Sequence, residues 1–511
     1  MRKLLPILLL SGAMVVRGQH DPQRNASRLI ATEDFAKANK ELAKANPKER
    51  ETHFVNMMLA LKKDDLKSAV EHAQQALDTR LSFSRLMAGP RELLPKLHAT
   101  DAYKKWATEY PTPALIHGPM VGSVTDASAT FWVRTAEEAE VEIRIGKGRA
   151  RSRSSKDRDY TTTVRVNGLQ PGTEYDYRVY IDGQQAEAEN TKFRTYPERG
   201  SGGKFKVGFG GGAGFVPQWE RMWDNILTFD PVAMFMLGDN VYIDQPEETL
   251  TQHYCYYRRQ SLPEWRRLVA STAMYSIYDD HDFGMNDCVP GPEIETPKWK
   301  RRVWNIFREN WVNPAYGGGE KQPGCWYDTY IGDVHFIFID GRYYRHRKGK
   351  VGKSMLGLVQ KQWLKDTLAA SKGTFKVIAS PVPWTVGIKP GSRDPWDGYP
   401  EEREEIFSFI ESKKLDGVFL IAADRHRTDL RTTKRDNGYD LFEFESSRLT
   451  NRHTHSVVKT EGLIWGYNKT CSFGLMSFNT TRKDPQVKFE CVSIDGQVIH
   501  DYTLKLSQIS N

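Results

Sequence analysis

The segment 278–287 carries the densest group of reactive side chains in the sequence, with four carboxylates, one imidazole and one amide. Asp280 could bind a metal ion, His281 could donate a proton, and Asp282 could orient the imidazole. A packed core does not collect so many charges, and a solvated loop rarely contains Phe-Gly-Met. The segment is therefore predicted to be functional.

Asp239 lies close after the apolar segment 233–237 and is directly preceded by Gly238. A buried strand that ends in Gly-Asp directs a carboxylate out of the sheet edge, where it can bridge hard cations. The alternative is an aspartate that caps a turn. Taken alone, this short pattern favours the turn.

Asp424 and His426 follow the apolar segment 418–422 and are two residues apart. Beyond the end of a strand, this spacing can present both side chains to one ion. The flanking Arg425 and Arg427 could bind phosphate oxygens through their forked guanidinium groups. The alternative is a strand end held by salt bridges.

Each of these clusters follows a short apolar strand in the region 204–511, where predicted strands alternate with helical stretches. The strands are predicted at 205–209, 233–237, 334–340, 375–380 and 418–422. In α/β architectures, reactive groups collect at the carboxyl ends of the strands. We therefore expect the clusters to meet at one edge of a sheet.

Two regions of different character precede these strands. Residues 25–110 are rich in Ala, Lys, Glu and Leu, with apolar residues at helical spacing, which predicts a short helical region. Residues 111–198 contain short alternating runs separated by turn residues, typical of an all-β sandwich. The stretch 168–175 resembles fibronectin type III-like domains.

Residues 1–18 have the pattern of a secretory signal peptide, because Arg2 and Lys3 precede an apolar stretch at 4–16. The alternative is a membrane anchor, for which the stretch is short. We therefore expect an exported protein that is periplasmic, cell-surface or secreted. No later apolar run is long enough to predict a transmembrane span.

The composition excludes several classes of protein. With 511 residues, of which 39% are hydrophobic and 27% charged, the chain can form a large core and is not wholly disordered. The net charge is +8, but basic and acidic residues are interspersed, so there is no nucleic-acid-binding signature. Five cysteines do not make a disulfide scaffold, although Cys471 and Cys491 could pair on neighbouring strands. The sequence does not define an oligomeric state.

The order of the motifs resembles the PhoD-like alkaline phosphatase/phosphodiesterase family over residues 204–493. The motifs are Gly-Asp-x-x-Tyr at 238–242, Asp-Asp-His-Asp at 279–282, Asp-x-Arg at 340–342, Ser-Pro-Val-Pro-Trp at 380–384, Asp-x-His at 424–426, and the segment 445–450. The resemblance implies an α+β fold, a four-layer α/β/β/α metallophosphoesterase sandwich. It also implies hydrolysis of phosphate esters by a metal-activated hydroxide.

The resemblance also implies roles for individual residues. The implied metal ligands are Asp239, Tyr242, Asp280, Asp424 and His426. The implied catalytic residues are His281, as the acid near the leaving group, and Arg342, as a phosphate contact. We further expect Asn240, Asn286, Arg425 and Arg427 to bind the phosphoester substrate.

One position departs from the family, because Gly211 stands where an iron-binding cysteine is expected. Either the site holds fewer ions or only hard cations, with calcium favoured and iron as a second candidate, or the glycine run 210–214 binds an anion through its backbone N–H groups. Glu220 could supply a substitute carboxylate or lie on a helix surface.

The sequence is compatible with two other functions. The chain could be a non-catalytic surface-binding protein on a degenerate metallophosphatase scaffold, or a hydrolase of another ester, such as a phospholipid head group or a sulfate. His453 and His455 could face the mouth of the site or lie in solvent.

Overall fold

The computed structural model describes residues 21–347 and 352–511, so the predicted signal peptide at 1–18 lies outside the described residues. The helical region is formed by α1 (Pro22–Ala31), α2 (Phe35–Leu42), α3 (Arg50–Lys62), α4 (Leu66–Asp78), α5 (Ser84–Ala88), α6 (Leu94–His98) and α7 (Asp101–Glu109). Asp21, Asp34 and Asp65 cap α1, α2 and α4 through their side chains. None of the described helices has both the length and the apolar character needed to cross a membrane.

Within the described residues, the larger sheet has nine strands in the order β22-β21-β20-β10-β11-β12-β1-β2-β5. They are β1 (Leu115–Gly122), β2 (Ser128–Thr135), β5 (Thr161–Asn167), β10 (Lys204–Gly210), β11 (Ala233–Leu237), β12 (Ala273–Ile277), β20 (Ser472–Asn479), β21 (Gln486–Ser493) and β22 (Val498–Lys505). The strands β10, β11 and β12 are parallel to one another. β1 extends this parallel set, with Gly122 opposite Met274.

The predicted all-β region therefore shares a sheet with the α/β region. Its second layer contains β3 (Glu140–Ile145), β4 (Gly148–Arg153), β7 (Arg178–Ile181) and β8 (Gln184–Gln185), with β6 (Glu174–Asp176) and β9 (Lys192–Arg194) as a separate pair. Tyr177 joins the two regions, because its buried hydroxyl donates to the carbonyl of Ala270 over 2.7 Å.

The second large sheet has the order β13-β14-β15-β16-β18-β17-β19 among the described residues. Its strands are β13 (Tyr327–Ile331), β14 (Val334–Phe338), β15 (Phe375–Ala379), β16 (Val418–Ala422), β17 (Thr428–Thr433), β18 (Leu441–Ser446) and β19 (Leu463–Tyr467). β14, β15, β16 and β18 run parallel, so their carboxyl ends lie at one edge.

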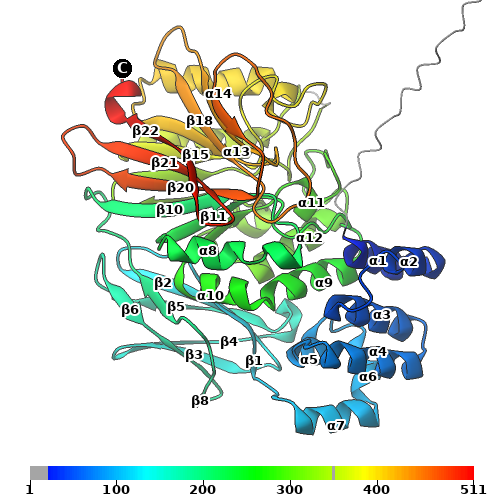
Figure 1. Ribbon diagram of the computed structural model, residues 1–511. Helices are drawn as coiled ribbons and strands as arrows, with labels where there is room; N and C mark the ends of the chain where they lie inside the picture. The colour runs from blue at the N-terminus through cyan, green and yellow to red at the C-terminus, as the bar shows by residue number, and fades with distance from the viewer. Residues whose placement is uncertain (1–20, 348–351) are drawn as a thin grey trace, which may run out of the picture.

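Alternating side chains on β14 separate the two faces of this sheet. Phe336 and Phe338 face the nine-stranded sheet, with ring centroids 4.9 and 5.0 Å from that of Phe235. Ile337 packs instead in the core under α13 (Gly357–Ala370) and α14 (Pro400–Ser412). α8 (Met222–Thr228) and α10 (Pro263–Ser271) cover the other large sheet (Figure 1). The predicted α/β/β/α sandwich is confirmed.

The carboxyl ends of the parallel strands in both sheets meet at a common edge. Gly211, just after β10, forms a parallel bridge with Ser447, just after β18. Three helices lie close to this edge: α9 (Thr249–Gln260), α11 (Asp280–Phe283) and α12 (Trp299–Asn310). Figure 1 shows α1 beside α9, so the helical region packs against the domain that carries the predicted site.

The suggested pairing of Cys471 and Cys491 is wrong, because both thiols are free. The register of β20 and β21 explains this result. Cys491 lies opposite Gly474, three residues along the chain from Cys471. The Cys471 thiol instead contacts the carbonyl of Asn451 at 3.7 Å.

Candidate metal centre

Asp239, Asp280 and His281 form the core of the candidate centre, with one possible ligand atom from each lying within 4.8 Å of the others. Asp239 follows β11, and the other two residues begin the short helix that follows β12. Because β11 and β12 are adjacent and parallel, their ends bring these side chains together. Both carboxylates are 2% exposed.

Tyr242 and His426 connect this cluster to the second sheet. The Tyr242 hydroxyl lies 2.8 Å from His426 Nε2, and the same nitrogen lies 3.9 Å from Asp239 Oδ2. His426 and Asp424 follow β16, whose carboxyl end faces those of β11 and β12. The five predicted metal ligands therefore belong to one shared edge.

The backbone around these ligands is strained. Asp239, Tyr242, Asp424 and His426 have positive φ angles of 53°, 51°, 73° and 50°. Side chains other than glycine rarely adopt this conformation, and it persists where the surrounding structure imposes it. Four of the five predicted ligands thus have a strained backbone, as is typical of loops whose conformation is needed to place functional side chains.

The electrostatics of Asp239 fit a bound cation. Burial, with added repulsion from Asp280 and Asp424, outweighs the attraction of His281 and raises the pKa of the Asp239 carboxyl to about 8. Its Oδ1 atom is buried without a hydrogen-bond partner among the described residues. Buried carboxylates in such a group need a positive partner, and carboxylate oxygens suit hard metal ions. The residues therefore fit the metal that the sequence predicts.

His281 is held by an ion-pair chain that reaches the first helix. Its Nδ1 is hydrogen-bonded to Asp244 Oδ1, and Asp244 Oδ2 accepts a 2.9 Å hydrogen bond from Arg24 Nη1. Burial opposes charge on His281, but Asp280, Asp244 and Asp239 outweigh it and raise the pKa of the imidazole well above its usual range. No sequence pattern predicts a role for Asp244 or Arg24.

The predicted role of Asp282 is wrong. Its carboxylate accepts hydrogen bonds from the backbone N–H groups of residues 240 and 241, at distances of 2.8 to 3.0 Å. It also accepts from the side-chain amide of Asn240 at 3.0 Å. Asp282 therefore stabilises the 239–242 loop, and Asp244 orients His281.

The predicted substrate residues Asn240 and Asn286 lie in different surroundings. The Asn240 amide donates inside the protein, to the Ile277 carbonyl at 2.8 Å, and its Oδ1 is buried without a partner among the described residues. Asn286 lines a cavity of about 460 Å³ together with His281 and two arginines of α1, Arg24 and Arg28.

Arg342 is completely buried and its donors are engaged by carboxylates. Nε donates to Asp279, and the two terminal nitrogens donate to Asp394 over 2.7 and 3.1 Å. One of these nitrogens also lies 3.7 Å from Asp280 Oδ1. This geometry replaces the expected phosphate contact with a positioning role, because Arg342 fixes the segment that carries Asp280.

Arg425 and Arg427 line a second cavity, of about 750 Å³, together with Lys389 and His455. Arg425 Nη1 lies 3.4 Å from Asp424 Oδ2, so this cavity adjoins the candidate centre. Arg427 donates to Asp429 over 2.8 Å. The predicted substrate role of Arg425 and Arg427 stays a prediction.

Comparisons with known proteins identify the family. The sequence model of the PhoD-like phosphatase family matches residues 204–489, which is more than half of the chain. The chain belongs to the PhoD-like phosphatase family. Residues 112–198 match a domain of unknown function (DUF7800), so the fibronectin type III-like resemblance is not confirmed.

One curated relative agrees with this membership, and two solved structures share the fold. The chain is 36% identical over 313 residues to "Alkaline phosphatase D" of Bacillus subtilis (strain 168), covering 52% of this chain and 53% of that protein. The chain thus spans about half the length of this curated relative. Two solved structures share the fold: "Structure of PhoD" (TM-score 0.63, 16% identity, 76% of this chain and 88% of that one) and purple acid phosphatase PPD1 from yellow lupin (Lupinus luteus) seeds (TM-score 0.59, 14% identity, 76% and 75%).

The glycine run of this PhoD-like domain does not bind an anion through its first N–H groups. Gly211 N–H donates to the Ser446 carbonyl and Gly212 N–H to the Gly238 carbonyl, each over 3.2 Å. A Cβ atom at position 211 would lie only 2.6 Å from the Cβ of Ala423. Gly211 therefore allows the end of β10 to approach the residue that precedes Asp424.

Glu220 is neither a ligand of the centre nor a surface residue. It is 3% exposed and accepts hydrogen bonds from Arg259 and from the Trp223 indole, the latter over 2.7 Å. Arg259 also donates to the carbonyl of Ala213 over 2.8 Å. This buried ion pair fixes the glycine run from the side of α9.

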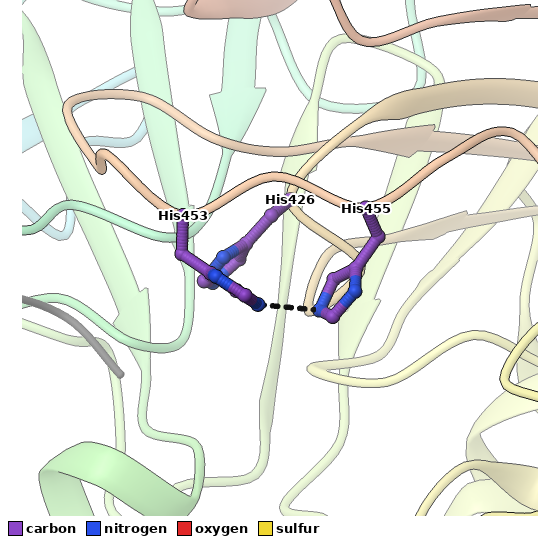
Figure 2. Close-up of side chains that lie close together, drawn as sticks. All are labelled: His426, His453 and His455. Carbon is purple, nitrogen blue, oxygen red and sulfur yellow. Dashed lines mark hydrogen bonds between the residues drawn. The ribbon is translucent and has the colours of Figure 1, made fainter. Parts of the chain in front are cut away.

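His453 and His455 converge on His426 (Figure 2). A ring nitrogen of each residue lies within 4.8 Å of the others, and the two Nε2 atoms of His453 and His455 are 3.2 Å apart. Burial lowers the pKa values of His426, His453 and His455 to about 3, 4 and 3, aided by nearby positive charges and opposed at His426 by the Asp424 carboxylate. These imidazoles are therefore neutral at neutral pH. Their sequence spacing alone did not reveal the cluster.

Proposed function

We propose that this chain is an exported, metal-dependent phosphoesterase that hydrolyses phosphate mono- or diesters. The observation that carries the proposal is the cluster of Asp239, Asp280 and His281 at the shared edge of the two sheets, in which both carboxylates are buried. Membership in the PhoD-like phosphatase family supports this chemistry. Export is supported by the signal-like pattern of residues 1–18.

Five residues would hold the metal: Asp239, Tyr242, Asp280, Asp424 and His426. A bound metal would supply Lewis acidity, which polarises phosphoryl oxygens and lowers the pKa of water. The oxygen-rich part of this set favours calcium, and the phenol and imidazole leave iron as a second candidate. The chain itself fixes these ligands through the strained loops that follow β11 and β16.

His281 is suited to protonate the leaving alkoxide. Because Nδ1 is hydrogen-bonded to Asp244, the imidazole would act through Nε2. Asp244 stabilises the positively charged ring and keeps it in one orientation. Arg24, donating to the same carboxylate, fixes Asp244 in turn.

The cavity lined by Lys389, Arg425 and Arg427 would bind the phosphoester. Its guanidinium and ammonium groups supply positive charge beside Asp424, where a phosphate would approach. Asn286 would contact the substrate from the cavity that also contains His281. Both cavities border the centre, so a diester could place one substituent in each.

Hydrolysis of p-nitrophenyl phosphate and bis(p-nitrophenyl) phosphate tests this function. Purified protein supplied with Ca²⁺, Fe or Mn²⁺ should hydrolyse at least one ester, and Asp239→Asn should remove that activity. Asp333→Asn is a matched control, because Asp333 is buried at the opposite end of β14 and binds Thr374 and Thr480. Metal binding without turnover of either ester would contradict phosphoester hydrolysis and favour another ester. Absence of both metal and turnover would favour a binding protein.

A further inference from the structure

The histidine cluster offers a second set of metal ligands with a different chemistry. We propose that His426, His453 and His455 bind a borderline transition-metal ion, with Zn²⁺ as the representative, at a position beside the oxygen-rich centre. The inference rests on the proposed function only through His426, which belongs to both sets.

The spacing of the ring nitrogens suits such an ion. Zinc–nitrogen bonds of 2.0–2.1 Å at tetrahedral angles place ligand nitrogens roughly 3.3 Å apart. The Nε2 atoms of His453 and His455 are 3.2 Å apart, and all three residues offer nitrogens within 4.8 Å of one another. Small side-chain rotations would complete the set.

The cluster contains a buried nitrogen without a partner. His426 is 4% exposed, and its Nδ1 has no hydrogen-bond partner among the described residues. Its Nε2 faces Tyr242, with 2.8 Å between Nε2 and the hydroxyl oxygen. Leaving a polar atom buried and unpaired is costly, and a metal ion would remove that cost.

Hydrogen bonds hold the loop of His453 and His455 against His426. Thr454, which lies between the two histidines, donates through its hydroxyl to the carbonyl of His426 over 3.1 Å. The side-chain amide of Asn468 donates to the carbonyl of His455 over 3.0 Å. These hydrogen bonds hold His453 and His455 close to His426, as Figure 2 shows. The two histidines are therefore not free, solvated loop residues.

Ligand chemistry distinguishes this site from the carboxylate cluster. Three imidazoles favour zinc, copper, nickel or iron, whereas calcium and magnesium require oxygen ligands. Three protein ligands leave a fourth position open, as in catalytic zinc sites. His455 also lines the cavity that contains Arg425 and Arg427, so the open position adjoins the proposed phosphate site.

Metal analysis of chelator-treated full-length protein tests the inference. After dialysis against Zn²⁺ and then metal-free buffer, His453→Ala and His455→Ala should each retain about one equivalent of zinc less than the parent protein. His72→Ala is the control, since His72 lies on α4 in the helical region. Circular dichroism checks that each variant is folded, and His455→Gln provides a smaller change.

Substitution with Co²⁺ gives a second readout, because a nitrogen-ligated tetrahedral site produces visible absorption bands that the variants should lose. Equal zinc content and equal Co²⁺ spectra in the parent and histidine variants would overturn the inference, whatever the hydrolytic activity. A zinc difference in protein that hydrolyses no phosphoester with any metal would instead contradict the proposed function and leave the histidine site standing.

Discussion

Replacing Asp244 with asparagine tests the assignment of His281 as the proton donor. The variant keeps the shape of the side chain but removes the negative charge shared by His281 and Arg24. Without that charge, the imidazolium is less stable and its orientation is less fixed. The chemical step should therefore slow where the leaving group needs a proton.

The expected loss follows from the position of Asp244 behind His281. A general acid contributes about 10²–10⁴-fold, and a partner that orients a reactive histidine contributes about 10–100-fold. We expect kcat for an alkyl phosphate such as glycerol 3-phosphate to fall by about 10–100-fold. For p-nitrophenyl phosphate, whose leaving group needs little protonation, the fall should be less than about threefold.

Stability must be measured in parallel, because Arg24 is 5% exposed and its ion pair with Asp244 would be lost. Breaking a buried ion pair costs at most about 3–5 kcal/mol, and the asparagine carbonyl retains part of the interaction. Thermal unfolding and metal content would separate this effect from catalysis, with Asp333→Asn as the control. Equal losses on the alkyl and aryl esters in a folded, metal-loaded variant would refute His281 as the acid.

Three further predictions concern the metal ligand Asp239 and the residues that hold the glycine run. Asp239→Asn should lower the metal content measured by elemental analysis, and full retention would contradict its role as a ligand. Gly211→Cys should lower the free energy of unfolding by about 1–3 kcal/mol, because its Cβ would lie 2.6 Å from the Ala423 Cβ and 2.9 Å from the Gly238 carbonyl oxygen. Adding Ala423→Gly should recover only part of this loss in denaturant titrations, because the contact with the Gly238 carbonyl remains. Glu220→Gln should lower the free energy of unfolding by about 3–5 kcal/mol, because the Arg259 guanidinium would stay buried without its carboxylate partner. A change in unfolding free energy below measurement error would show that this ion pair does not stabilise the glycine run.

Much of the fold could be predicted from short-range patterns. The segments 233–237 and 418–422 are strands as expected, because continuous apolar runs bounded by glycine and aspartate are typical of buried parallel strands. The shared sheet could not be predicted, since it depends on the pairing of Gly122 with Met274 in a distant segment. Hydrogen bonds between strands that are far apart in sequence leave no local signal.

In the candidate site too, local sequence patterns predict some residues, whereas contacts between distant segments leave no local signal. Asp239 could be predicted because it follows a strand end, and Asp280 and His281 because their segment is so dense in reactive side chains. Asp244 could not be assigned, because its partner Arg24 lies 220 residues away in the chain.

The alternative of an anion site at the glycine run is wrong for a related reason. The N–H group of Gly211 is used by a carbonyl on another strand, at Ser446. Arg342 likewise has carboxylate partners from two other loops, Asp279 and Asp394. The types of these residues are visible in the sequence, but the partners that already engage their hydrogen-bonding groups come from segments far away in the chain.

Removal and return of metal tests the central claim most directly. Protein treated with a chelator should lose hydrolysis of p-nitrophenyl esters, and stepwise addition of Ca²⁺ or Fe should restore the rate in proportion to the metal bound. The claim predicts that Asp239→Asn binds less of this metal than the parent protein and does not regain activity. Undiminished hydrolysis by metal-free protein, or full metal loading with no hydrolysis of any phosphoester, would contradict it.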